Sequence, residues 1–311
     1  MSASPSLSPS SSSGLIGVTG ATGQLGKLAV AALLARGVPA TSIVALVRSP
    51  ARWQQQQQQQ QQSSAAPSTS SVAARAFDYS KGDELASSLQ GVTQLLLVSS
   101  SEVGQREAQH RAVIAAAQAA GVGRIVYTSL LRADTSQLAA LPAEHVATEL
   151  LLRDSAVPFT ILRNGWYSEN YESSVKAALA HGALVGASGA GRVSAASRAD
   201  YADAAAAVLT SAGHEGRTYE LAGDEAFTLE QLAAEISAQS GKAVPFKNLT
   251  VDEYRAVLVG AGVPAGYAAL IAAWEPAIEK GALLDEDRQL STLTGKPTRG
   301  IKELVAAVRS A

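Results

Sequence analysis

A glycine-rich turn after a short apolar run is the strongest chemical signal in the sequence. Gly20, Gly23 and Gly26 are spaced three residues apart and follow the apolar residues 15–18. A helix-patterned run then extends to Gly37. Glycines let the backbone turn tightly and approach an anion, and the first N–H groups of the following helix point at that anion. The pattern predicts a pyrophosphate cradle. The alternative is a tight strand-to-helix turn that binds nothing.

The residue that closes the next apolar run bears on which dinucleotide would bind. Residues 43–47 are apolar and rich in β-branched side chains, and Arg48 follows them, with Arg52 nearby. An NAD-binding unit usually has an acid here, which binds the ribose hydroxyls. An acid would repel a 2′-phosphate, whereas a guanidinium pairs with it through two N–H bonds. Arg48 therefore favours NADPH over NADH. The alternative is a solvated loop charge.

Strand and helix patterns alternate along the first half of the chain. Apolar strand-like runs at 72–77, 95–98, 124–128 and 159–162 are separated by helical patterns, among them 107–120 and 144–153. This alternation predicts an α/β fold of Rossmann type with a doubly wound parallel sheet. We expect residues 14–170 to form the NAD(P)-binding domain, and residues 171–311 to complete the sheet and form a smaller substrate lobe.

The predicted sheet also suggests where ligands bind. In doubly wound sheets they lie beyond the carboxyl ends of the strands, so the polar residues that follow each strand are candidates. Asp78 ends the third strand-like run. Its carboxylate is placed to accept a hydrogen bond from an adenine amino group.

Composition excludes several classes of site and partner. The 311 residues carry a formal net charge of −2, which gives no basic field for nucleic acid. No cysteine is present, which removes disulfides and thiolate chemistry and fits a reducing, cytoplasmic environment. The four histidines lack metal-ligand spacing, so we expect no metal. No apolar stretch approaches the roughly 20 residues that span a membrane.

Two segments have the composition of disordered chain. Residues 1–13 are rich in Ser and Pro and contain no Arg or Lys, so we interpret them as a disordered tail. A Ser-rich, acid-free start is also a feature of organellar transit peptides, but the missing Arg argues against one. Residues 54–71 begin with a run of Gln and continue with Ser, Ala, Pro and Thr. We expect them to form a disordered insertion in the NAD(P)-binding domain.

Longer segments resemble a known family. The glycine turn is similar to that of the NmrA-like group of atypical short-chain dehydrogenase/reductases. The segments LLLVSSSEVGQREAQHR at 95–111 and LRNGWYSENY at 162–171 resemble, more specifically, the bacterial type-2 NAD(P)H:quinone oxidoreductases. The resemblance runs from about residue 15 to 308 and is interrupted by the Gln-rich segment.

The resemblance implies a role for individual residues. Arg48 would bind the 2′-phosphate, and Asn170 would face the nicotinamide or the quinone. The residues that would hold the pyrophosphate are Gly20, Ala21, Thr22, Gly23, Gln24 and Leu25. Those that would line the dinucleotide are Ser101, Glu102, Val103, Arg106, Gln109, His110 and Arg111. Trp166 and Tyr167 are candidates for stacking on a flat quinone. They are equally well interpreted as core or rim residues.

One departure from the wider superfamily concerns proton transfer. A Tyr-x-x-x-Lys pair normally follows the fifth strand, whereas here the corresponding stretch holds His145 and Glu149. Alcohol–ketone chemistry needs a strong proton relay, but quinone reduction is less demanding, because a quinone is already electrophilic. His145 is a candidate proton donor, since its ordinary pKa is near 6.5. We favour the alternative that it is a surface histidine on a helix.

The function implied by the resemblance is NADPH-dependent quinone reduction. Hydride would pass directly from NADPH to a quinone, without flavin or metal, and the sequence leaves a homodimer open. The missing Tyr/Lys pair sustains a second hypothesis, a non-catalytic NADP(H)-binding redox sensor of the NmrA-like type. Fold alone does not separate the two.

Overall fold

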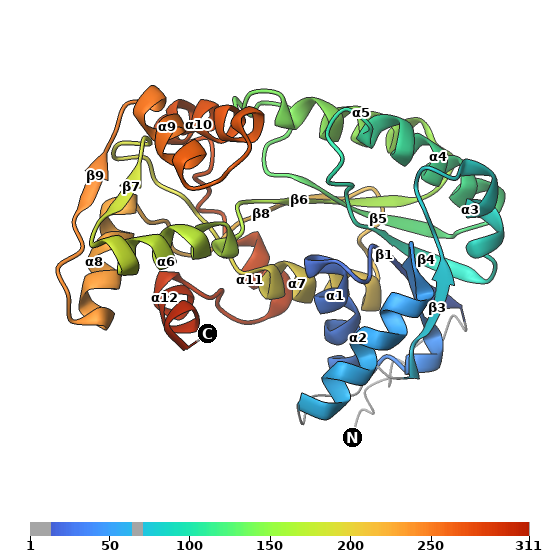
Figure 1. Cartoon of the computed structure of the whole chain (residues 1–311). Coiled ribbons are helices and arrows are strands. Elements are labelled where there is room, and N and C mark those ends of the chain that lie inside the picture. Colours follow the sequence, from blue (N-terminus) through green and yellow to red (C-terminus); the bar gives the residue numbers. More distant parts are fainter. Residues whose placement is uncertain (1–13, 64–70, 311) are drawn as a thin grey trace, which may run out of the picture.

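The computed structural model describes residues 14–63 and 71–310. Its main element is a seven-stranded parallel sheet with the order β3-β2-β1-β4-β5-β6-β8. The strands are β1 (Leu15–Thr19), β2 (Ile43–Val47), β3 (Ala73–Ala76), β4 (Val92–Leu97), β5 (Arg124–Leu130), β6 (Phe159–Asn164) and β8 (Thr218–Leu221). Strand β1 lies inside the sheet, and the strands that follow it first extend the sheet to β3 at one edge and then to β8 at the other (Figure 1). This confirms the predicted Rossmann-type fold.

Both faces of the sheet are buried, which explains why its strands read as apolar runs. Along β2, Ile43, Ala45 and Val47 pack into one core, and Val44 and Leu46 pack into the other. Side chains alternate between the two faces of a strand, so one short run supplies both cores. The first core lies against α1 (Gln24–Ala35), α7 (Arg198–Thr210) and α11 (Gln289–Thr294). The second lies against α3 (Gly82–Ser88), α4 (Arg106–Ala119) and α5 (Leu141–Asp154).

The segment after residue 170 contributes to both parts of the molecule. It supplies α7 and β8 to the sheet and also forms a smaller lobe with its own apolar core (Figure 1). The elements of the lobe are α6 (Glu172–His181), β7 (Leu184–Gly186), α8 (Leu229–Ser240), β9 (Phe246–Asn248), α9 (Val251–Gly260), α10 (Ala265–Glu279) and α12 (Ile301–Ser310). The parallel pair of β7 and β9 was not foreseen from the sequence.

The Gln-rich segment differs in part from the expectation. Helix α2 runs from Pro50 to Ser63, so the prediction of disorder is wrong for residues 54–63. Trp53 is 4% exposed, and its indole Nε1 donates to the carbonyl of Val72 at 3.2 Å. Gln57, one helical turn further on, is also buried. An anchored start therefore extends a helix into residues whose composition alone predicts disorder. The expectations for residues 1–13 and 64–70 lie outside the described residues.

Within residues 14–63 and 71–310, no helix is long and apolar enough to cross a membrane.

Candidate active site

The glycine turn joins β1 to α1 in a geometry that only glycine fits without strain. Gly20 has φ +57°, in the left-handed region, and its carbonyl accepts from the N–H of Gly23 at 2.8 Å. A Cβ on Gly26 would lie 2.3 Å from that same carbonyl oxygen, so the helix packs directly on the turn. Gly23 caps α1 without a side-chain hydrogen bond, which leaves the first N–H groups of the helix available to a ligand.

A cleft of about 290 Å³ opens over this turn, at the carboxyl ends of β1 to β4. Its lining residues are Gly20, Thr22, Gly23, Gln24, Leu25, Gly26, Arg48, Phe77, Asp78, Tyr79, Val98, Ser99, Ser100, Ser101, Glu102 and Gln109. The structure therefore brings together most of the residues expected to contact a dinucleotide. Ala21 is the exception within the turn, because it is fully buried in the core beneath.

Two aromatic residues of the cleft were missed by sequence reasoning. Phe77 and Tyr79 flank Asp78 at the end of β3 and meet edge-to-face with their ring centroids 5.9 Å apart. The Tyr79 hydroxyl donates to the carbonyl of Val98 at 2.8 Å, which joins the third and fourth strand ends. An aromatic on each side of a strand-ending acid was the available signal.

Arg48 and Asp78 lie at the same end of the cleft. The Arg48 side chain is 74% exposed, and its Nη1 lies 3.5 Å from Oε1 of Glu102. Asp78 accepts from the main-chain N–H and the hydroxyl of Ser80, at 3.1 and 2.7 Å. These hydrogen bonds lower the pKa of the Asp78 carboxyl, so it is a stable anion and acceptor at neutral pH. An exposed guanidinium and a preformed acceptor here suit the phosphate and base of an adenosine moiety.

The loop after β4 is held from behind by buried residues. His110 is fully buried, and its Nε2 accepts from the N–H of Ser100 at 3.0 Å. Arg106 is also buried, and its Nε donates to the carbonyl of Ser100 at 2.7 Å. The expectation that His110 and Arg106 line the dinucleotide is therefore not matched by their positions. They lie behind the loop that presents Ser100, Ser101 and Glu102.

Two more residues expected at the dinucleotide lie apart from the cleft. Val103 is 59% exposed and is not among the lining residues. Arg111 pairs with Glu107 at 2.8 Å on the outer side of α4, along a separate groove. In a helix, residues four apart share a face, so Arg111 points the same way as Glu107, into this groove and not into the cleft.

The two residues that replace the Tyr/Lys pair are buried and bonded to the sheet. His145 is 5% exposed, and its Nδ1 lies 2.9 Å from the hydroxyl of Tyr127 on β5. The interpretation of His145 as a surface histidine is therefore wrong. Burial, and then the charge of Arg106, lowers the pKa of His145 to about 3, so its imidazole is neutral at pH 7. Glu149 accepts from two nitrogens of Arg163, at 2.9 and 2.7 Å, which binds α5 to β6.

Residues 20–212 match the model of a family described as NAD(P)H-binding. The chain belongs to this NAD(P)H-binding family. Quinone oxidoreductase 2 of Escherichia coli is 51% identical over 273 residues, which cover 88% of this chain and 91% of that protein. The predicted resemblance to the bacterial quinone oxidoreductases is thereby confirmed.

Solved structures of relatives agree with this membership. The crystal structure of the E. coli NADPH-dependent quinone oxidoreductase complexed with NADPH has a TM-score of 0.88 at 50% identity, and the match covers 95% of this chain and 100% of that chain. Triphenylmethane reductase from Citrobacter sp., complexed with NADP(H), has a TM-score of 0.86 at 36% identity, over 94% of this chain and 99% of that one.

A buried acceptor in the cleft also suits an NAD(P)H ligand. Gln109 donates from Nε2 to Oε2 of Glu102 at 2.7 Å, but its buried Oε1 has no hydrogen-bond partner among the described residues. A buried acceptor left unpaired costs free energy, and a ligand N–H would satisfy it. The described part of the chain holds no cluster of three or more His, Cys, Asp or Glu side chains that suits a metal ion.

The segment at 166–171 lies outside the 290 Å³ cleft, after β6. Trp166 packs edge-to-face against Trp274 of α10, with ring centroids 5.5 Å apart, so it belongs to the core of the lobe. Tyr167 meets Tyr201 of α7 in the same way at 5.3 Å. Of the candidates at the quinone end, Asn170 is the exposed one. It lies in the short 3-10 helix η3 (Ser168–Tyr171).

Proposed function

We propose that this chain is an NADPH-dependent quinone oxidoreductase that uses neither flavin nor metal. The observation that carries the proposal is the cleft, which is lined by both the glycine turn and Arg48. It is supported by the 51% identity to a quinone oxidoreductase over 88% of the chain. Bound NADPH supplies a hydride, and the protein supplies binding, orientation and polarity.

We assign roles to the residues that line the cleft and, from the resemblance of its segment, to Asn170. The free N–H groups at the start of α1 bind the pyrophosphate, and Arg48 pairs with the 2′-phosphate. Ser101 and Gln109 also line the cleft, and Glu102 lies beside Arg48, where the 2′-phosphate displaces it. Asn170 lies at the acceptor end, as the resemblance of its segment implies. Apart from Glu102, each of these residues acts by holding reactants in place, which is a large part of catalysis for a reactive acceptor.

No strong acid is assigned in this proposal. His145 is held neutral by burial, with its pKa lowered to about 3, so it has no proton to donate from an imidazolium at pH 7. A hydroquinone is only weakly basic as a product, so water suffices as the proton source. The loss of the Tyr/Lys pair is therefore compatible with turnover of quinones and unfavourable for alcohol–ketone chemistry.

The test is NADPH oxidation by the purified protein, with and without a simple benzoquinone. We expect quinone-dependent oxidation by protein whose absorption spectrum lacks flavin bands, unchanged by added FAD, FMN or EDTA. Activity that appears only with added flavin would refute the direct-transfer part of the proposal. Tight NADPH binding without reduction of any quinone tested would instead favour the non-catalytic redox sensor.

A further inference from the structure

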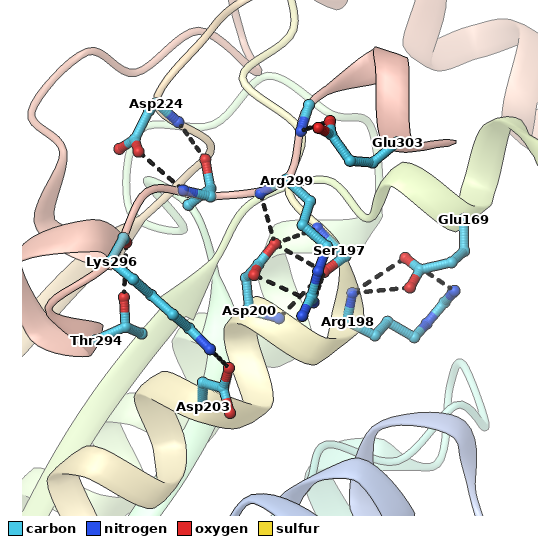
Figure 2. Close-up of polar contacts among 12 residues, drawn as sticks. Glu169, Ser197, Arg198, Asp200, Asp203, Asp224, Thr294, Lys296, Arg299 and Glu303 are labelled. Carbon is cyan, nitrogen blue, oxygen red and sulfur yellow. Dashed lines mark hydrogen bonds and ion pairs between the residues drawn. The ribbon is translucent and has the colours of Figure 1, made fainter. Parts of the chain in front are cut away.

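One arginine holds the segment that carries Asn170. Arg198 is the first residue of α7, and its main-chain N–H donates to both carboxylate oxygens of Glu169, at 2.9 and 3.1 Å (Figure 2). Its Nη1 lies 3.6 Å from Glu169 Oε2, and its Nη2 donates to Oδ1 of Asn170 at 3.1 Å. The same guanidinium lies over the ring of Tyr167, with Cζ 4.5 Å from the centroid. One side chain thus contacts three residues of the 167–170 segment.

Arg198 itself is fixed by the start of α7. Ser197 and Asp200 form a capping box there, in which the Ser197 hydroxyl accepts from the N–H of Asp200 and the Asp200 carboxylate accepts from the N–H of Ser197. The main chain of Arg299 donates to the same Asp200 carboxylate at 3.1 Å, from the loop that precedes α12 (Figure 2). The Arg198 side chain is only 16% exposed. A guanidinium so held does not have to be ordered when a ligand binds.

The contact determines which end of the Asn170 amide is free. An arginine side chain has N–H donors and no acceptor, so the group that faces it must be the amide oxygen. The amide nitrogen, with its two N–H groups, is then directed away from Arg198. Asn170 is exposed, so those donors are accessible to a ligand. The pair therefore presents a hydrogen-bond donor, and not an acceptor, at this position.

We propose that Arg198 is a positioning residue that presents the Asn170 amide as a hydrogen-bond donor to a carbonyl oxygen of the acceptor quinone. The inference rests on the proposed function, which places Asn170 at the acceptor end. Negative charge develops on a quinone oxygen as hydride arrives, and a preorganised N–H directed at that oxygen stabilises the charge. An amide without Arg198 is free to rotate and offer its oxygen instead.

The experiment measures quinone turnover and NADPH affinity in the unmutated protein and in five variants. Arg198→Met removes the guanidinium but keeps an unbranched side chain, and we expect kcat to fall by about tenfold, the scale of one charge-assisted hydrogen bond. Asn170→Ala removes the donor. In the double variant, kcat should be no lower than in Asn170→Ala alone, because Arg198 acts through Asn170. NADPH affinity should stay within about twofold throughout, since the contact is made at the reacting end.

Asn170→Asp separates donation from simple packing. A carboxylate keeps a strong partner for Arg198 but puts an oxygen where the amide nitrogen was, so turnover should fall as far as in Asn170→Ala. The matched control is Arg299→Met, because that guanidinium binds Ser197 and Asp200 at the same helix start without contacting the 167–170 segment. We expect Arg299→Met to keep full turnover.

The outcomes distinguish this inference from the function on which it rests. Full turnover in Arg198→Met or in Asn170→Asp, beside an active unmutated protein, overturns the inference alone. Additive losses in the double variant also overturn it, because they indicate a general structural effect. If Arg198→Met does not fold, Asn170→Asp remains decisive. An unmutated protein that binds NADPH but reduces no quinone overturns the proposed function and the inference with it.

Discussion

Replacing Arg48 by alanine tests the cofactor preference most directly. Its guanidinium borders the cleft at the end of β2, where a 2′-phosphate would distinguish NADPH from NADH. A charge-assisted hydrogen-bonded pair contributes about 1.5–3 kcal/mol, which corresponds to roughly a tenfold to hundredfold ratio of affinities. Arg48→Ala should therefore weaken NADPH binding by this factor and leave NADH binding unchanged.

The surroundings of Arg48 narrow the expected ratio of NADPH to NADH affinity. Its side chain is 74% exposed, so solvent and salt screen any pair it forms. We therefore expect a ratio nearer tenfold than hundredfold. Its partner within the protein is Glu102, 3.5 Å away and 53% exposed. Such exposed ion pairs contribute only about 0–1 kcal/mol, so the phosphate displaces Glu102 at little cost. Removing this acid with Glu102→Gln should strengthen NADPH binding by up to about fivefold.

Calorimetric titration with NADPH and NADH checks both variants against the unmutated protein at low and high salt. Arg52→Ala is the matched control, because Arg52 lies one turn further on and is not among the residues that line the cleft. Equal affinity of the unmutated protein for the two dinucleotides would refute the reasoning. Weaker NADPH binding by Glu102→Gln would also refute it, because it would assign Glu102 a favourable contact with the ligand.

Three further predictions concern stability and are checked by chemical or thermal unfolding. Trp53→Ala should lower the free energy of unfolding by about 3–5 kcal/mol, because the indole is 4% exposed. The control Gln55→Ala, on the exposed side of α2, should change it by no more than about 0.5 kcal/mol. Equal effects of the two substitutions would mean that α2 is not anchored by Trp53. Gly26→Ala should lower the free energy of unfolding by about 1–3 kcal/mol and weaken NADPH binding, because its Cβ would lie 2.3 Å from a backbone carbonyl oxygen. Unchanged stability and binding would show that the backbone of the turn shifts to make room for the methyl group. Burial lowers the pKa of His110 and His145 from the ordinary 6.5 to about 3 in the folded chain. The free energy of unfolding is therefore fully present above pH 6.5 and falls as the pH drops toward 3. The expected loss is about 1.4 kcal/mol per pH unit for each histidine. Urea unfolding between pH 7 and 5 should show a shallower loss for His145→Gln, and an unchanged slope would contradict the buried, neutral imidazole.

The part of the cleft around the glycine turn could be predicted from the sequence, because it is made by residues that are close together in the chain. The glycine turn lies between a strand and a helix that are contiguous in the chain, and its conformation depends on a few backbone angles that glycine permits. Arg48 follows β2 directly, and Asp78 lies two residues after the end of β3. Parallel strands bring their carboxyl ends to one edge of the sheet, so the position of these residues follows from the fold class.

The positions of the other candidate residues could not be predicted, because they depend on contacts between segments that are far apart in the chain. His110 and His145 look like surface or ligand-facing residues in the sequence, yet β4, β5 and α5 enclose them and hold them neutral. The helix through residues 54–63 depends on Trp53, which packs against the core and donates to Val72 beyond the Gln-rich segment. Their composition alone had predicted disorder.

The sequence by itself determined the fold class and predicted most of the residues that line the cleft over the glycine turn, because both rest on periodicity and on turn chemistry within a few residues. Only the tertiary structure decided which end of the Asn170 amide is free to bind a ligand. Its amide is oriented by Arg198, 28 residues away in the chain, and that pairing exists only because α7 packs beside the 3-10 helix η3. Burial and long-range hydrogen bonds decide the protonation and orientation of a polar side chain, and neither is encoded in its neighbours along the chain.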